Sequence, residues 1–174
     1  MVEITETTSR IIENELIAKH GLIVVPKAGA LATFVGMAFD IGRFIRPNLP
    51  TGQAFNEQFS TTLPLFPIEG LPGGVMLVPA NERLSPRQRL ERTAHEAKHV
   101  HQFRHPAPGY DAWQWGALYV AHSEFRAAQE AGGFLVNKAL SWALDGQQIP
   151  TAAIVHTITN NYAIDDADRR MVGG

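Results

Sequence analysis

The segment His95-Glu96-Ala97-Lys98-His99 contains the residues whose types and spacing could do chemistry. Residues four apart on a helix lie one turn above each other, so the rings of His95 and His99 could bind one ion at about 2.0–2.1 Å. Glu96 would point to the side of that ion, where a carboxylate can accept a proton from water instead of binding the metal. The pattern therefore predicts a Zn²⁺ site with His95 and His99 as ligands and Glu96 as the catalytic base.

A catalytic zinc site usually has a third protein ligand, and we expect it from the segment 113–144. The chain contains no cysteine, so this ligand must be a histidine or a carboxylate. Glu124 is the preferred candidate because Ala127, one turn later, is small and would let two helices approach closely enough to share an ion.

Two further residues of the same segment are alternatives for the third ligand. Glu130 lies six positions after Glu124 and therefore points to a different face of the helix, so we do not expect both to bind. Arg126, one turn before Glu130, could be its partner in an ordinary surface ion pair. His122 would instead complete a site with three histidines.

These residues resemble the glutamate zincins, and more narrowly the small metallopeptidase-like proteins of bacteria and their phages. The resemblance rests on H-E-x-x-H followed by Val100 and Gln102, and on the later sequence Glu124-Phe125-Arg126-Ala127. It covers about residues 74–132. The resemblance implies a zinc metallopeptidase in which His95, His99 and Glu124 bind the metal and Glu96 is the base. It also implies that a strand leads into the H-E-x-x-H helix.

The motif lies inside a segment with clear helix boundaries. Ser85 can cap free amides, Pro86 suits the first helical position, and Pro106 disfavours helical geometry at the residue before it. We therefore predict a helix over residues 86–104, with the two histidines well inside it.

The remaining segments must position this helix. Strand signals at 58–63 and 74–78 predict a small sheet or β-hairpin packed on it, and a third short strand is predicted at 22–25, ending before Pro26. Helices are predicted at 6–20, at 113–144 with Gly132-Gly133 as a potential break, and at 151–163. The expected fold is an α+β, mainly helical, zincin-like domain. One domain spans 1–174, with a helical N-terminal part (1–56), a zincin core (57–163) and a loose tail (164–174).

Residues 28–45 form an apolar segment that contains three glycines. We interpret it as a buried segment whose glycines let a neighbour approach. Asp40 and Arg43 interrupt it before the roughly 20 apolar residues that a membrane-spanning helix needs, so membrane contact is not expected. A surface for a homo-oligomer or for virion assembly is the alternative.

Side chains near the motif could assist the reaction. Gln102 shares the side of His95 and His99, whereas His101 and His105 point away from it. A donor to the developing oxyanion is also needed, and Tyr110, Tyr119, His122 and His156 are the candidates.

Composition limits the function classes. The 174 residues carry a net charge of -2 with 45% hydrophobic and 18% charged residues, which suits a folded domain and gives no reason to expect nucleic acid as a partner. The N-terminus lacks the pattern of a signal peptide, so a cytoplasmic or phage-virion location is expected. The prediction is a zinc-dependent hydrolase acting on a peptide or protein substrate. The alternative is a structural or phage-particle assembly protein that retains a non-catalytic zincin-like metal site.

Overall fold

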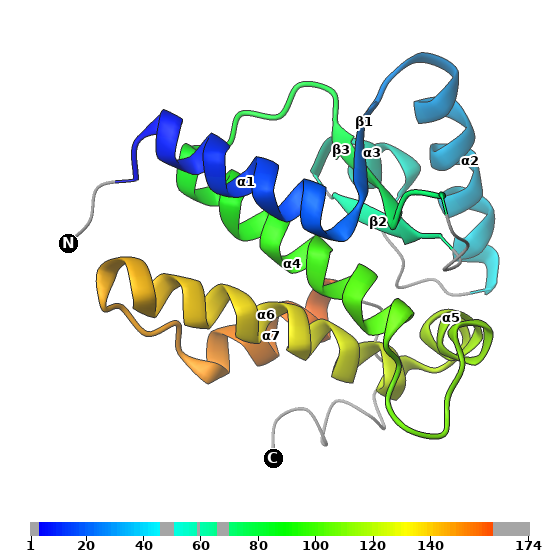
Figure 1. Ribbon diagram of the computed structural model, residues 1–174. Coiled ribbons are helices and arrows are strands. Elements are labelled where there is room, and N and C mark those ends of the chain that lie inside the picture. Colours follow the sequence, from blue (N-terminus) through cyan, green and yellow to red (C-terminus); the bar gives the residue numbers. More distant parts are fainter. Residues whose placement is uncertain (1–3, 46–50, 59, 66–69, 162–174) are drawn as a thin grey trace.

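The computed structural model describes residues 4–45, 51–58, 60–65 and 70–161. It is mainly helical with one small sheet, so the α+β class is confirmed (Figure 1). The expected tail, 164–174, lies outside the described residues. In chain order the elements are α1 (Glu6–His20), β1 (Leu22–Lys27), α2 (Gly29–Ile45), α3 (Gly52–Gln58), β2 (Thr61–Pro64), β3 (Gly74–Pro79), α4 (Pro86–Arg104), α5 (Ala112–Ala121), α6 (Ser123–Asp145) and α7 (Thr151–Asn161).

The sheet has three strands in the order β1-β3-β2. β1 pairs in parallel with β3, and β2 pairs antiparallel to β3. β1 continues through Pro26 to Lys27, so the prediction that Pro26 ends the strand is wrong. The reason is that β1 is an edge strand, where a residue that cannot donate a hydrogen bond is tolerated.

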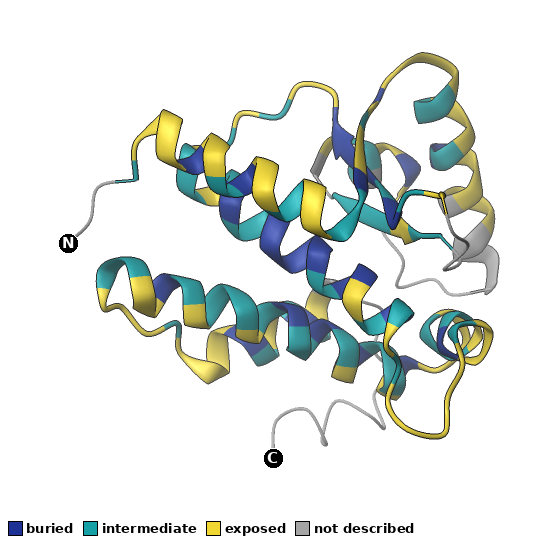
Figure 2. Cartoon of the chain, in the orientation of Figure 1, coloured by how far each residue is buried: buried dark blue, intermediate teal, exposed yellow. Residues whose placement is uncertain are grey.

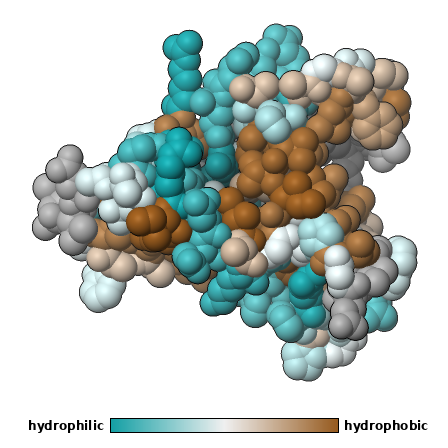
Figure 3. Space-filling model, turned by 45° about the horizontal axis from the view of Figure 1, so that its top comes forward, coloured by the Kyte–Doolittle hydropathy of each residue, from teal (hydrophilic) through white to brown (hydrophobic). Residues whose placement is uncertain are grey.

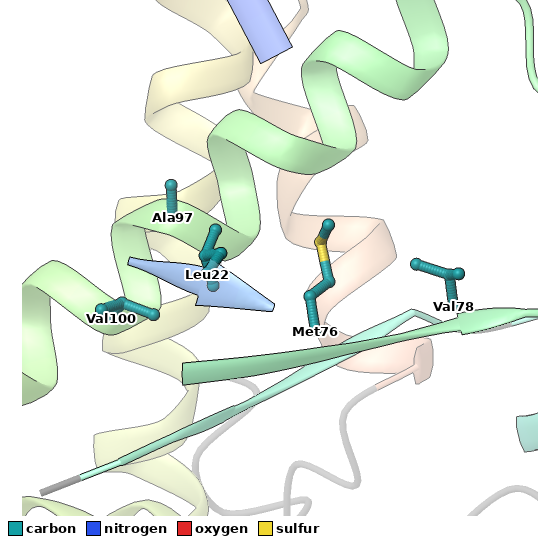
Figure 4. Close-up of a cluster of buried hydrophobic side chains, with 5 residues drawn as sticks. All are labelled: Leu22, Met76, Val78, Ala97 and Val100. Carbon is teal, nitrogen blue, oxygen red and sulfur yellow. The ribbon is translucent and has the colours of Figure 1, made fainter. Parts of the chain in front are cut away.

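Helix α4 lies at the centre of the molecule, between α1 on one side and α6 on the other (Figure 1). Ser9 of α1 donates from Oγ to the carbonyl of Pro86 at 2.6 Å, which fixes the start of α4 against α1. The sheet packs on α4 through a buried apolar cluster, shown in Figure 4, of Leu22, Met76, Val78, Ala97 and Val100. These contacts bury the middle of α4, where the motif lies (Figure 2).

The segment predicted as one helix over 113–144 is two helices. His122 adopts extended geometry, with φ −113° and ψ 115°, and separates α5 from α6. Gly132 and Gly133 lie inside α6 and do not break it. Beyond α6, α7 packs back on it through Ala127, Ile154 and Ile158.

The apolar segment 28–45 forms helix α2, and much of its described surface is exposed. Gly36 does allow a close approach, because a Cβ atom on Gly52 would lie 2.2 Å from the Gly36 carbonyl oxygen. However, Phe34, Met37 and Ile41 are 72%, 58% and 60% exposed, so the prediction of burial is wrong for this face. A broad hydrophobic area is visible on the molecule in Figure 3. Within the described ranges, no helix combines the length and apolar character needed to cross a bilayer.

Candidate metal centre

Helix α4 begins as predicted. Ser85 accepts from the backbone N–H of Gln88, whose side chain accepts in turn from the N–H of Ser85, and Pro86 follows directly. This capping box fixes the start of the helix. His95, Glu96 and His99 are all buried in the third and fourth turns. Three buried polar side chains so close together need hydrogen-bond or ion-pair partners from other elements.

The partner of the two histidines is Glu130 of α6. Its Oε2 lies 3.2 Å from His95 Nε2, and its Oε1 lies 3.3 Å from His99 Nε2. The two Nε2 atoms are 3.1 Å apart. Among the described residues, His95, His99 and Glu130 are the one group of three side chains whose donor atoms converge closely enough to hold a metal ion.

The donor atoms of these three residues lie within 4.8 Å of one another, which is close enough for one metal ion to be held between them. Ligands at about 2.0–2.1 Å from a tetrahedral ion lie about 3.3–3.4 Å from one another. The two Nε2 atoms are separated by 3.1 Å, and each of them faces a different oxygen of Glu130, at 3.2 Å for His95 and 3.3 Å for His99. The group therefore could bind a metal ion, and zinc suits two imidazoles and one carboxylate.

The structure brings Glu130, and not Glu124, to the histidines, so the preference for Glu124 is corrected. Glu124 is exposed in the first turn of α6, whereas Glu130 is only 1% exposed. His122, the third candidate, is exposed between α5 and α6. The expected surface ion pair of Glu130 is not what the structure shows, because this carboxylate is buried and faces His95, His99 and Tyr119. Nη1 of Arg126 donates to the carbonyls of Tyr119 and Val120.

The two glycines of α6 explain why Glu130 reaches the site. A Cβ atom on Gly133 would lie 2.5 Å from Cε1 of the His95 ring, and one on Gly132 would lie 2.6 Å from Nε2 of Gln102. Glycine at both positions lets α6 pack directly on the side chains of α4. The pair that we interpreted as a helix break is therefore the contact surface that turns Glu130 toward the histidines.

Gln102 orients His99, as its position on the helix predicted. Its Nε2 donates to the carbonyl oxygen of Gln129 at 3.1 Å, so its Oε1 must be the atom facing His99 Nδ1 at 3.0 Å. An amide oxygen can only accept, so Nδ1 of His99 carries the proton. This leaves the lone pair of His99 Nε2 directed at the centre, as a metal ligand requires.

Tyr119 of α5 is the candidate oxyanion donor that lies at the centre. Its hydroxyl group donates to Oε1 of Glu130, and its ring lies 5.9 Å from the ring of His99. The other three candidates are exposed: Tyr110, His122 and His156. His101 and His105 are also exposed and outside the group, in agreement with the sequence prediction.

The electrostatics of the centre favour a protonated His99 beside an ionised Glu130. Burial disfavours the charged form of His99, but the negative charge of Glu130 and its hydrogen bond outweigh burial and raise the pKa of His99 to about 9. Burial also disfavours a charged Glu130, but the charge of His99 and the hydrogen bonds from both histidines lower the pKa of this carboxyl group well below its usual range. Without a metal, the proton on His99 supplies the positive charge that a bound cation would provide.

Glu96 is buried beside the centre but is not one of the three converging donors. Its charge acts on His99 and on Lys27 at the end of β1. Lys27 is itself buried, and burial lowers its pKa to about 8 against the opposing charges of Glu82 and Glu96. The charge of Glu96 therefore favours the protonated forms of both His99 and Lys27. No local pattern of residues points to Lys27, because only the pairing of β1 with β3 brings it here.

Comparison with protein-family models, with curated proteins and with solved structures finds no match. The geometry of the centre itself therefore carries the functional argument.

Proposed function

We propose that this protein is a zinc-dependent hydrolase, a metallopeptidase of the H-E-x-x-H type that cleaves amide bonds. The observation that carries the proposal is the convergence of three buried donor residues within 4.8 Å of one another, with the buried carboxylate of Glu96 outside the group. A site built only for stability would not need that additional buried acid, because burying an extra charge is costly.

His95, His99 and Glu130 would hold the ion, and Gln102 would keep His99 in the binding tautomer. A bound zinc ion would act as a Lewis acid toward the scissile carbonyl and would make water nucleophilic near neutral pH. Glu96 accepts the proton of the attacking water and then delivers it to the leaving amine. Tyr119 can donate its hydroxyl hydrogen to the oxygen on which negative charge develops.

A peptide is the substrate class that the fold supports best. β2 is an edge strand of the sheet within the described residues, and it lies beside α4. An extended peptide can pair with an exposed edge strand through its backbone, whatever its side chains are. Such a peptide would lie along the helix that carries the motif.

The decisive experiment combines zinc content with turnover of a fluorogenic peptide mixture. The Glu96→Gln protein should bind zinc like the wild type and lose at least about 100-fold in kcat, because a positioned base contributes about 10²–10⁴-fold. Glu91→Gln, on the same helix and paired with Arg87, is the matched control and should keep both properties. Wild-type protein that binds no zinc, or Glu96→Gln protein with full activity, would refute the proposal.

The second candidate is a structural or phage-particle assembly protein with a non-catalytic metal site. The exposed apolar residues of α2, Phe34, Met37 and Ile41, favour it, because monomeric proteins rarely leave such a face uncovered. In that case the protein would bind zinc and turn over no peptide, and Glu96→Gln would change neither zinc content nor the oligomeric state.

A further inference from the structure

A cavity of about 250 Å³ lies next to the metal centre, beyond Gln102 and Trp115. It is enclosed by the end of α4, the following loop, α5 and α6, and its lining residues are Gln102, His105, Ala107, Tyr110, Trp115, Phe125 and Gln129. Its volume is below the roughly 300–1,000 Å³ of pockets for drug-sized ligands. The cavity is therefore of a size to take a single side chain.

The walls offer aromatic rings to an occupant. The ring of Phe125 lies 6.1 Å from that of Trp115 at 77°, and 5.9 Å from that of Tyr110 at 58°. These separations are within the 4.5–7 Å range at which aromatic rings attract one another edge to face. These three rings already pack against one another, so an occupant of the cavity would meet a continuous aromatic wall.

The indole N–H of Trp115 and the side-chain amide of Gln102, two polar groups of the walls, are already bonded to the protein. Trp115 Nε1 donates to Gln129 Oε1 at 3.2 Å, and the amide of Gln102 bonds to His99 at one end and to the Gln129 carbonyl at the other. Displacing these bonds would leave buried polar groups unsatisfied, which is costly. The part of the wall formed by Gln102, Trp115 and Phe125 therefore suits an apolar occupant better than a polar one.

The cavity is within reach of a substrate bound at the centre. The ring of Trp115 is stacked 5.0 Å from that of Tyr119, which lies 5.9 Å from His99, so Trp115 is no more than about 11 Å from this ligand. An extended peptide advances about 3.3–3.6 Å per residue. A side chain two or three residues from the reacting bond would therefore arrive at the cavity.

We propose that this cavity binds an aromatic side chain of the peptide substrate, two or three residues from the bond that is cleaved. The inference rests on the hydrolase function proposed above and names the residue class that the enzyme selects. Aromatic residues at that position should be preferred over alanine by at least about 10-fold in kcat/KM.

The first test is mass spectrometry of the products from a defined peptide mixture. The wild-type protein should cleave peptides with Phe, Tyr or Trp at one fixed distance from the cleaved bond. Ala107→Trp, at the exposed mouth of the cavity, should fill it and abolish that preference, while Ala152→Trp, exposed on α7, should retain it. Phe125→Leu keeps an apolar wall without the ring and should shift the preference toward aliphatic residues. Glu96-dependent cleavage with no such preference, or a preference unchanged by Ala107→Trp, overturns the inference and leaves the hydrolase function standing.

The second test does not depend on catalysis. N-acetyl-phenylalaninamide should shift the indole N–H signal of Trp115 in the NMR spectrum of zinc-free protein, and N-acetyl-alaninamide should not. Ala107→Trp should abolish the shift and Ala152→Trp should preserve it. Binding without any peptide cleavage would support an aromatic-binding cavity and refute the hydrolase. No binding of the phenylalanine compound to the wild-type protein would refute the cavity's role.

Discussion

Replacing Gly133 with alanine should remove the metal site while leaving the protein folded. The new Cβ atom would lie 2.5, 2.7 and 2.8 Å from three atoms of the His95 ring, where ordinary contacts are 3.4–4 Å. The ring would have to retreat by about 0.9 Å, the difference between 3.4 and 2.5 Å. Metal–ligand distances tolerate only about ±0.2 Å, so His95 could no longer bind in the same geometry.

The ring has little room for this movement. It contacts the ring of Phe134, with centroids 4.8 Å apart, and that of His99 at 4.9 Å. We therefore expect zinc affinity to fall by at least about 100-fold, the upper end of what losing an outer-shell partner costs. The free energy of unfolding should change less. Overpacking destabilises a protein by about 1–3 kcal/mol, and alanine in place of glycine inside a helix stabilises it by about 0.5–1 kcal/mol.

Two other glycines provide graded controls for this substitution. A Cβ atom on Gly116 of α5 would meet only Phe103 Cε2, at an ordinary 3.7 Å, so Gly116→Ala should keep full zinc affinity. Gly132→Ala would press on Nε2 of Gln102, the end of a flexible side chain, and should weaken zinc binding by about 10-fold through the loss of His99 orientation.

Competition with a chromophoric chelator measures the affinities, and far-UV circular dichroism with thermal melting of the zinc-free proteins measures folding. If Gly133→Ala binds zinc as tightly as Gly116→Ala does, the packing of α6 on His95 does not define the site. If Gly133→Ala instead fails to fold, Gly132→Ala still tests the packing, since its contact is with a side chain that can move.

Two further predictions concern the third ligand and the effect of pH. Glu130→Gln should lower zinc affinity by at least about 100-fold in the same chelator competition. Glu124→Gln, at an exposed residue, should change the affinity by less than about two-fold. The reverse pattern would mean that Glu124 binds the metal. In zinc-free protein, folding raises the pKa of His99 to about 9, so its contribution to stability is fully present below pH 6.5 and is lost as the pH rises toward 9. Folding lowers the pKa of Glu130, so its contribution to stability is lost as the pH falls below 4.5. Zinc replaces the proton on His99, so the increase in Tm that zinc produces should grow between pH 6.5 and 9. Melting curves with and without chelator measure this increase, and an increase that does not depend on pH would contradict the prediction.

The local features of the site were predictable from the sequence. The capping box at Ser85, the helix over 86–104 and the facing of His95 and His99 depend only on neighbours within one or two helical turns. Gln102 was placed correctly for the same reason, since its spacing from His99 defines its side of the helix. Glu96 follows from its place in the motif, although its catalytic role stays a prediction.

Which carboxylate faces His95 and His99 was decided by tertiary structure, because it depends on the rotation of α6 against α4. Glu124 and Glu130 are six residues apart and face directions about 120° apart around the helix. Both residues are candidates from the sequence, and only the packing of Gly132-Gly133 on His95 and Gln102 turns Glu130 toward the histidines. The break at His122, the arrival of Tyr119 at the centre and the position of Lys27 likewise depend on contacts between segments distant along the chain. Such contacts are chosen by how complete surfaces fit together, which no local pattern of residues specifies.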